Sequence, residues 1–210
     1  MSAKLDKEEI REKYNKFAPW YDLTESIPEF FGIKKLRRRL LKRASGKVLE
    51  IAVGTGRNLR YYPETCEITA VDFSPAMLEI ARRKTDKLGM NVTFHVMDGE
   101  NLSFPDRSFD TVVDSLTICT FTDPVAALQE FARVCKENGR ILLLEHGRSD
   151  RRWLGRLQDR WAGRHAKSLG CHMNREPLEL VRQAGLKIIR SQQYFFGMFH
   201  VIEAAPSGSV

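Results

Sequence analysis

The chain has 210 residues, of which 42% are hydrophobic, 10% aromatic and 29% charged, a composition typical of a globular domain that excludes disordered and collagen-like chains. Its 34 Lys and Arg outnumber 27 Asp and Glu to give a net charge of +7, which is compatible with nucleic acid, an anionic lipid surface or an acidic small molecule as partner. No apolar run approaches the roughly 20 residues of a membrane span. The charged N-terminus lacks a signal-peptide pattern, so we expect a cytoplasmic protein.

The first 45 residues are expected to be helical, with breaks at 18–20 and 27–28, where prolines occur. Strands and helices then alternate. Strands are predicted at 47–53, 67–73, 91–98, 108–118, 139–147, 186–192 and 199–205. Helices are predicted at 74–88, 123–134, along the polar stretch after residue 147, and at 176–185.

This alternation predicts a doubly wound, Rossmann-like α/β fold with a mostly parallel seven-stranded sheet. Only six residues separate the last two predicted strands, too few for a parallel crossover, so they should form an antiparallel hairpin. We expect one domain over 1–210, with a helical lid (1–45), a cofactor-binding core (46–147) and substrate-side helices with the closing hairpin (148–210).

The four cysteines are widely spaced and include no C-x-x-C pair. That spacing predicts reduced thiols, and neither a disulfide framework nor a metal site.

A glycine-containing turn follows the first predicted strand, in the run EIAVGTGRN (50–58). A dinucleotide site would need a third glycine, but Leu59 stands there, after Gly54 and Gly56, so that interpretation is weakened. S-adenosylmethionine (SAM) has no phosphate to place and needs only small residues for close backbone approach. Asp72, 18 residues beyond Gly54, could accept hydrogen bonds from both ribose hydroxyls. NAD sites use a carboxylate in the same way, and a helix N-cap is the alternative role.

Other strand ends carry small or acidic residues that should converge on the same cleft. Asp98 could accept a hydrogen bond from an adenine amino group. The run from Asp114 to Thr117 should lie beside the transfer centre.

The runs VLEIAVGTGRN, AVDFSPAMLEIARRK, VMDGENLSFPDRSFDTVV and LQEFARVCKENGRILLLEHG together resemble the class I SAM-dependent methyltransferases over about residues 47–147. Ala52 departs from the family, which usually has glycine there. The resemblance implies SAM as cofactor, S-adenosylhomocysteine as product and no metal. The residues it implies around the cofactor are Glu50, Ala52, Gly54, Thr55, Gly56, Asn58, Asp72, Phe73, Ser74, Met77, Asp98, Gly99, Glu100, Asp114, Ser115 and Leu116.

The N-terminal run KYNKFAPWYD (13–22) resembles the opening of the UbiE/MenG-type quinone methyltransferases. There an aromatic segment closes over the cofactor, which makes Tyr14 and Tyr21 candidate lid residues. Plain packing of a helix on the sheet edge is the alternative.

Enzymes of this superfamily that methylate nucleic-acid amines carry an N/D-P-P-Y/F signature after the fourth strand. The run from Asp114 to Thr117 has neither proline nor aromatic residue. This argues against exocyclic base amines as acceptors and leaves other RNA or protein sites open. We expect a small-molecule or lipid acceptor, with nucleic acid a less favoured partner.

The region 145–176 should specify the acceptor. Arg152, Arg156, Arg160 and Arg164 recur every four residues, with tryptophans on neighbouring faces. Such a basic amphipathic helix is typical of one lying on an anionic membrane, which would give peripheral contact with the inner membrane surface. A solvated helix whose tryptophans pack on the body is the alternative.

With Glu145-His146 and the run from Gly170 to Arg175, this region loosely resembles the PmtA-type phospholipid N-methyltransferases and methyltransferase-like proteins that act on lipophilic or thiol substrates. His146 is the candidate general base, because imidazole titrates near neutrality; a structural histidine is the alternative. The residues expected to contact the acceptor are Tyr21, Thr117, His146, Trp161, His172 and Arg175.

Methyl transfer is an in-line displacement that requires chiefly alignment and exclusion of water. The expected acceptor is a phosphatidylethanolamine-type amine, followed by a quinone-ring carbon, a thiol or another small metabolite. A SAM-binding protein without turnover and a nucleotide-dependent dehydrogenase are the remaining alternatives. The oligomeric state is left open.

Overall fold

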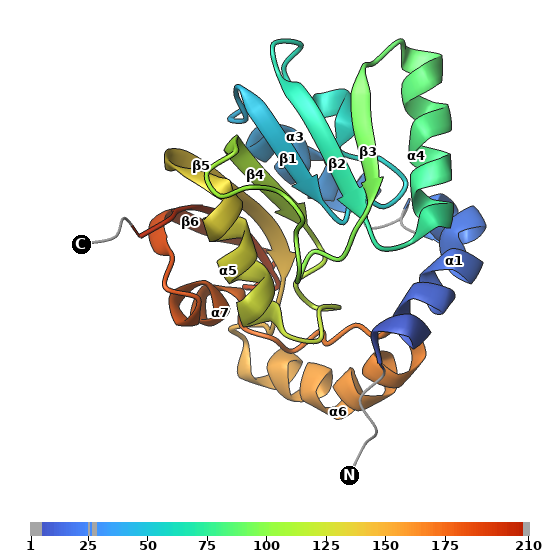
Figure 1. Cartoon of the computed structure of the whole chain (residues 1–210). Coiled ribbons are helices and arrows are strands. Elements are labelled where there is room, and N and C mark those ends of the chain that lie inside the picture. Colours follow the sequence, from blue (N-terminus) through green and yellow to red (C-terminus); the bar gives the residue numbers. More distant parts are fainter. Residues whose placement is uncertain (1–5, 25, 27–28, 208–210) are drawn as a thin grey trace.

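Seven strands of the computed structural model pair into one sheet in the order β3-β2-β1-β4-β5-β7-β6 (Figure 1). The structure describes residues 6–24, 26 and 29–207. The strands are β1 (Lys47–Ile51), β2 (Glu67–Asp72), β3 (Val92–Val96), β4 (Phe109–Ser115), β5 (Cys135–His146), β6 (Lys187–Tyr194) and β7 (Phe199–Ala205). Among them only β7 runs against the others, between β5 and β6. The predicted Rossmann-like sheet with a C-terminal hairpin is confirmed.

The helices cover both faces of this sheet. They are α1 (Lys7–Thr24), a π-helical turn η1 (Glu29–Ile33), α3 (Lys34–Leu41), a 3₁₀ turn η2 (Leu59–Tyr61), α4 (Pro75–Leu88), α5 (Pro124–Val134), α6 (Arg152–Leu169) and α7 (Pro177–Gln183). One core cluster joins α5 and α7 to the sheet, and a second joins α3 and α4 to its other face. These four helices cover the faces of the sheet and not the carboxyl edge of its parallel strands, where ligands bind in folds of this type.

Capping residues in the sequence set where the two central helices begin. The Ser74 hydroxyl accepts a hydrogen bond from the Met77 amide (3.2 Å), and Pro75 occupies the first turn of α4. Asp123 does the same for α5, accepting from the amides of Val125 and Ala126. Each cap follows a loop at the carboxyl edge, so it also fixes where that loop turns.

Two predicted boundaries differ clearly from the structure, and a third is not tested by it. α1 continues through Pro19, although a break was expected at 18–20; contacts made by Asn15 and Asp22, on either side of the proline, hold both halves against the body. The expected break at 27–28 lies outside the described residues. β5 begins at Cys135 rather than 139, because Cys135 pairs with Phe109 across a bulge.

Part of the segment expected to form a lid packs into the body instead. Leu36, Leu40 and Leu41 of α3 are buried against the sheet. Their spacing of four and five residues puts them on one helix face. Within the described part of residues 1–45, α1 is therefore the element that spans the site.

Candidate active site

A pocket opens at the carboxyl edge of the sheet, with an empty volume of about 790 Å³ that includes its mouth. Thirteen of the residues predicted to contact cofactor or acceptor line it. They are Tyr14, Tyr21, Ala52, Gly54, Asp72, Phe73, Ser74, Met77, Asp98, Gly99, Glu100, Leu116 and Thr117. The strand order explains the convergence: Ile51 of β1 lies beside Asp114 of β4, and Asp72 of β2 beside Val96 of β3.

The turn after β1 has a left-handed backbone at three positions, with φ of 47° at Ala52, 56° at Gly54 and 77° at Gly56. A Cβ on Gly56 would come within 2.9 Å of the Leu59 side chain and 3.2 Å of the Ala81 Cβ, so this glycine permits close packing on α4. Ala52 adopts the same backbone at a steric cost that glycine avoids. The turn therefore keeps its shape in spite of the departure from the family pattern.

Asp72 joins this turn to the start of α4. Its carboxylate accepts hydrogen bonds from the Gly54 amide (2.7 Å) and the Ser74 amide (2.8 Å). Burial raises the pKa of Asp72 to about 6, although these two hydrogen bonds act in the opposite direction. Each oxygen keeps a lone pair for a further donor, so the ionised group can serve two hydroxyls of a ligand.

A second pair of carboxylates supports the turn after β4. Burial and the proximity of Asp114 raise the pKa of Glu145 well above its usual range, and burial raises the pKa of Asp114 to about 6. Glu145 accepts from the amides of Thr117 and Ile118, each at 3.3 Å, and the Thr117 hydroxyl donates to Asp114. Leu116 is held at φ 63° between them, and Leu116 and Thr117 face the pocket.

Several residues predicted for the cofactor lie beneath the pocket wall rather than on it. This group comprises Glu50, Thr55, Gly56, Asn58, Asp114 and Ser115, which are absent from the pocket lining. The Asn58 amide donates to the Ser115 hydroxyl (3.1 Å) and accepts from buried Arg37 (2.6 Å). Glu50 is 2% exposed, and burial raises its pKa to about 7. These side chains shape the turns that face the pocket.

Helix α1 crosses the pocket and is attached to the body along its length. Near its first turn, the Lys7 ammonium contacts the carboxylates of Asp98 (2.6 Å) and Glu100 (2.9 Å). At its middle, Asn15 accepts a hydrogen bond from the Ser74 hydroxyl (2.6 Å). The C-terminal half of α1 carries Asp22, whose contacts attach that end of the helix to the body.

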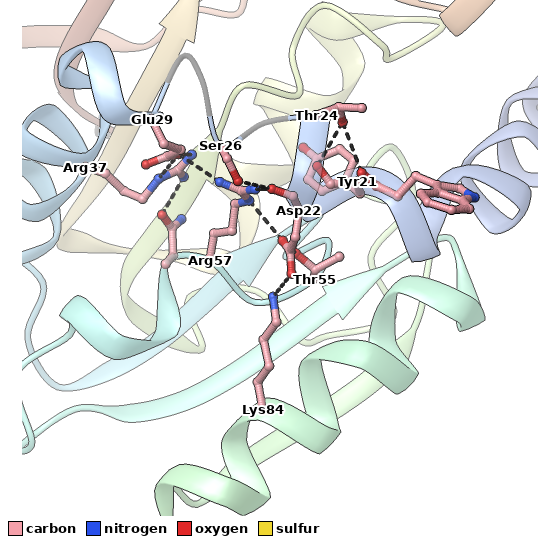
Figure 2. Close-up of polar contacts among 11 residues, drawn as sticks. Tyr21, Asp22, Thr24, Ser26, Glu29, Arg37, Thr55, Arg57 and Lys84 are labelled. Carbon is pink, nitrogen blue, oxygen red and sulfur yellow. Dashed lines mark hydrogen bonds and ion pairs between the residues drawn. The ribbon is translucent and has the colours of Figure 1, made fainter.

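Asp22 links the end of α1 to the glycine turn and to α4 (Figure 2). Its carboxylate accepts hydrogen bonds from Thr55 (2.7 Å), Arg57 (3.0 Å) and Lys84. Burial opposes ionisation, but the hydrogen bonds of Lys84 and Thr55 outweigh it and lower the pKa of Asp22. Thr55, predicted as a cofactor residue, thus bonds with α1.

The sequence did not indicate seven pocket residues. These are Lys7, Ile10, Arg11, Met97, Thr120, Phe121 and Thr122. The three on α1 follow a helical spacing of three and four residues, which signals a buried face but no ligand. The last three lie three to five residues after the end of the predicted run 114–117, in the same turn, and extending that run would have found them.

Four of the six residues predicted for the acceptor do not line the pocket. Trp161 is on α6 and 44% exposed. The Arg175 guanidinium donates to the carbonyls of Ile118 and Phe121, the latter at 2.9 Å. The His172 amide donates to the Cys119 carbonyl (2.9 Å). The His146 Nε2 lies 3.4 Å from the Cys171 sulfur. The segment 171–175 therefore packs behind the turn 116–122.

Comparison with known proteins relates the core to one family. Residues 49–143 match the family model described as "Methyltransferase domain". The chain is 32% identical over 219 residues to "Methyltransferase OMS1, mitochondrial" of *Saccharomyces cerevisiae*, a match that covers 95% of this chain and 46% of the relative.

Two bacterial relatives match over a shorter part. A phosphatidylethanolamine N-methyltransferase of *Cereibacter sphaeroides* is 36% identical over 60% of this chain and 63% of its own length. A demethylmenaquinone methyltransferase of *Thermus thermophilus* is 36% identical over 63% of each chain. The chain thus spans about half to two thirds of the length of these relatives.

A solved structure supports the same assignment over nearly the whole chain. The SAM-dependent methyltransferase of *Thermotoga maritima*, described as a possible histamine N-methyltransferase, superimposes with a TM-score of 0.69 at 25% identity. It covers 94% of this chain and 100% of its own. Within the described residues, no helix is long and apolar enough to cross a membrane. Residues 49–143 therefore form a methyltransferase domain of the class I type, which uses S-adenosylmethionine as cofactor.

Proposed function

We propose that this protein transfers the methyl group of SAM to a small amphipathic or lipid-like acceptor at an anionic membrane surface, with a phosphatidylethanolamine-type amine as the preferred acceptor. The observation that carries the proposal is the solvent face of α6. Trp153 is 69% exposed, Leu157 46% and Trp161 44%, and they recur every four residues. Apolar side chains left in solvent on a helix suit a lipid surface better than a solvated helix.

Charge on the same helix supports this orientation. Arg152, Arg156, Arg160 and Arg164 are exposed, each one position before or three after a residue of the apolar row. Phosphate headgroups would meet this arginine row while the tryptophans enter the interface.

Helix α6 also meets the lid, which connects the proposed membrane face to the pocket (Figure 1). The Lys13 ammonium of α1 donates to the carbonyls of Lys167 (2.6 Å) and Ser168 (3.0 Å) at the end of α6. Trp20 and Leu23 of α1 are 63% and 68% exposed. An acceptor leaving the interface would therefore reach the pocket beside α1.

In this function the chain itself supplies alignment and exclusion of water. We assign Asp72 to the ribose hydroxyls, the left-handed turn at 52–56 to the methionine end, and Phe73 and Met77 to the adenine. Leu116 and Thr117 would lie beside the reacting methyl group. SAM supplies the electrophilic methyl, so the protein needs only to hold an acceptor nitrogen in line with it.

The Cereibacter relative supports the amine acceptor, and the Thermus relative supports a quinone-ring carbon as the second candidate.

The experiment that tests the acceptor incubates methyl-labelled SAM and the protein with vesicles of phosphatidylglycerol and phosphatidylethanolamine. In parallel samples, phosphatidylcholine or a demethylated quinone replaces the phosphatidylethanolamine. Label in the amine lipid alone supports the proposal. Label in the quinone alone moves the assignment to the second candidate. SAM binding with no product in any sample would indicate a binding protein without turnover.

The membrane face has its own matched control. Replacing Arg152, Arg156, Arg160 and Arg164 together by Gln should weaken sedimentation with anionic vesicles at least tenfold, because each basic residue near such a surface contributes about 1 kcal/mol. SAM binding should not change.

The control replaces four exposed basic residues in α3 and at its C-cap, namely Lys34, Lys35, Arg38 and Lys42, by Gln. The net charge falls by the same amount, but on another helix. Equal loss of vesicle binding in both variants would contradict a specific role for α6.

A further inference from the structure

Two cysteines and a histidine from distant parts of the chain meet behind the turn 116–122. The Cys171 sulfur lies 3.4 Å from the Cys119 sulfur and 3.4 Å from the His146 Nε2. The three ligand atoms all lie within 4.8 Å of one another. The cysteine spacing gave no sign of this cluster, because 52 residues separate Cys119 from Cys171 and 25 separate His146 from Cys171.

These distances suit a soft divalent metal. Bonds of about 2.3 Å to sulfur and about 2.0–2.1 Å to imidazole nitrogen place tetrahedral zinc ligands about 3.5–3.8 Å apart. Two of the three separations are within a few tenths of an ångström of that range. Thiolate and imidazole are also donor types that zinc prefers, whereas magnesium and calcium prefer oxygen ligands.

The two sulfurs lie among charged groups and next to the pocket. Cys119 is 3% exposed. Arg175, Glu145 and His165 contribute charge near the two thiols. Tyr14, which lines the pocket, also lies close enough to interact electrostatically with both thiols. Two thiolates would neutralise a divalent cation, so the cation adds no net charge beside the Arg175 guanidinium.

We propose that Cys119, His146 and Cys171 form a mononuclear zinc site behind the turn 116–122, next to the proposed acceptor side of the pocket. Three protein ligands leave one coordination position for water or an acceptor group. Binding releases any protons still on the two thiols to solvent, with no change of oxidation state. The site joins the segment 171–175 to β5 and to the turn after β4. His146 then acts as a metal ligand, and the general-base role expected from its position at the end of β5 is not needed.

The test measures the metal itself and does not depend on the identity of the acceptor. Purified full-length protein would be stripped with chelator, titrated with Zn²⁺ against a competing indicator, and analysed for metal content. A parallel titration with Co²⁺ would show the thiolate-to-cobalt charge-transfer band. We expect one metal ion per chain in the parent protein.

Cys171→Ser and His146→Ala should each weaken zinc binding at least about 100-fold, since loss of supporting residues around a metal alone costs about 10- to 100-fold. Cys66→Ser, which removes a half-buried thiol elsewhere, should bind zinc like the parent. SAM binding by each variant shows that it has folded.

Absence of stoichiometric zinc in the parent would overturn the site, as would full affinity in Cys171→Ser. A Cys119–Cys171 disulfide recovered from the non-reduced protein would overturn it as well, in favour of a redox pair. Each of these results leaves the methyl-acceptor assay unaffected, so the two proposals fail separately.

Discussion

The two walls of the pocket differ in the sequence separation of the residues that contact each other within them. The wall that we propose for the cofactor, called the cofactor wall, consists of the turn 52–56 and residues 72–77. Its central contacts join Asp72 to Gly54 and Ser74, 18 and 2 residues away. The wall that we propose for the acceptor, called the acceptor wall, consists of α1 and the turn 116–122, with the segment 171–175 behind it. Its contacts join Lys7 to Asp98 and Lys13 to Lys167, 91 and 154 residues apart.

This difference follows from how parallel strands place their ends. Neighbouring strands bring short turns together at one edge, so the cofactor wall is complete once the sheet has formed. The acceptor wall forms only when both ends of the chain have folded back over that edge. The cofactor wall should therefore tolerate few changes, whereas changes on the acceptor wall should act mainly through closure.

The largest effect is expected at the centre of the cofactor wall. Asp72→Ala removes the proposed acceptor of two ribose hydroxyls and leaves the Gly54 and Ser74 amides without their partner. The loss of charge-assisted hydrogen bonds costs about 1.5–3 kcal/mol, which corresponds to about 10- to 150-fold weaker SAM binding by calorimetry. Asp86→Ala, an exposed carboxylate on the same α4 helix, should leave the affinity unchanged. An unchanged affinity in Asp72→Ala would remove Asp72 from the cofactor site.

Proton uptake by the same group should weaken binding in a defined pH range. Burial raises the pKa of Asp72 to about 6, and only the ionised carboxylate can accept from both hydroxyls. SAM affinity should therefore be level above pH 7 and fall as pH drops through 6, by up to about tenfold per unit for one coupled proton.

Asp114 and Glu50 also have raised pKa values, about 6 and about 7, so the assignment needs a variant. Asp72→Asn cannot take up that proton and should lose the fall near pH 6. If the fall persists in Asp72→Asn, another carboxylate is responsible.

A smaller effect is expected where the acceptor wall closes on the cofactor wall. Asp22→Ala removes the contacts of α1 with Thr55, Arg57 and Lys84. Because Asp22 is 41% exposed, solvent screening limits each ion pair to about 0.2–1 kcal/mol. We expect SAM dissociation to accelerate about two- to tenfold in stopped-flow measurements, with little change in association.

Glu12→Ala on the same helix is the matched control, because its ion pair with Lys16 is 3.7 Å long and mostly exposed. Equal dissociation rates in the two variants would show that Asp22 does not hold α1 over the bound cofactor.

The same contrast explains what the sequence could predict. The alternation of strands and helices, the C-terminal hairpin and most of the pocket residues from Ala52 to Gly99 follow from local patterns, because periodicity and turn chemistry are properties of short segments. Gly54 and Asp72 could be placed together because each ends a predicted parallel strand.

Contacts between distant segments left no such pattern. Nothing near Lys7 signals that its ammonium meets Asp98 and Glu100, and nothing near Cys119 signals Cys171. The helix α1 continues through Pro19 because contacts with the body outweigh a local preference. Such features depend on tertiary packing and could not be read from neighbouring residues.

The smallest effect concerns the one position where the cofactor wall departs from the family pattern. Ala52 has φ 47°, a left-handed backbone that costs a residue with a Cβ about 1–2 kcal/mol. Ala52→Gly removes this strain but increases the entropy of the unfolded chain by about 0.4–1 kcal/mol. The net stabilisation of about 0.5 kcal/mol should raise the melting temperature by about 1–2 °C in a chain of this size.

Gly54→Ala provides the opposite change on the same turn. Gly54 has φ 56°, and a Cβ added there would meet no atom within 4 Å. The substitution would therefore strain the backbone without causing a steric clash. It should lower the melting temperature by a few degrees while Ala52→Gly raises it. A lower melting temperature in Ala52→Gly would mean that the Ala52 methyl group, packed beside the core cluster of α5, contributes more than its backbone strain costs. The alanine would then be a stabilising feature of this turn.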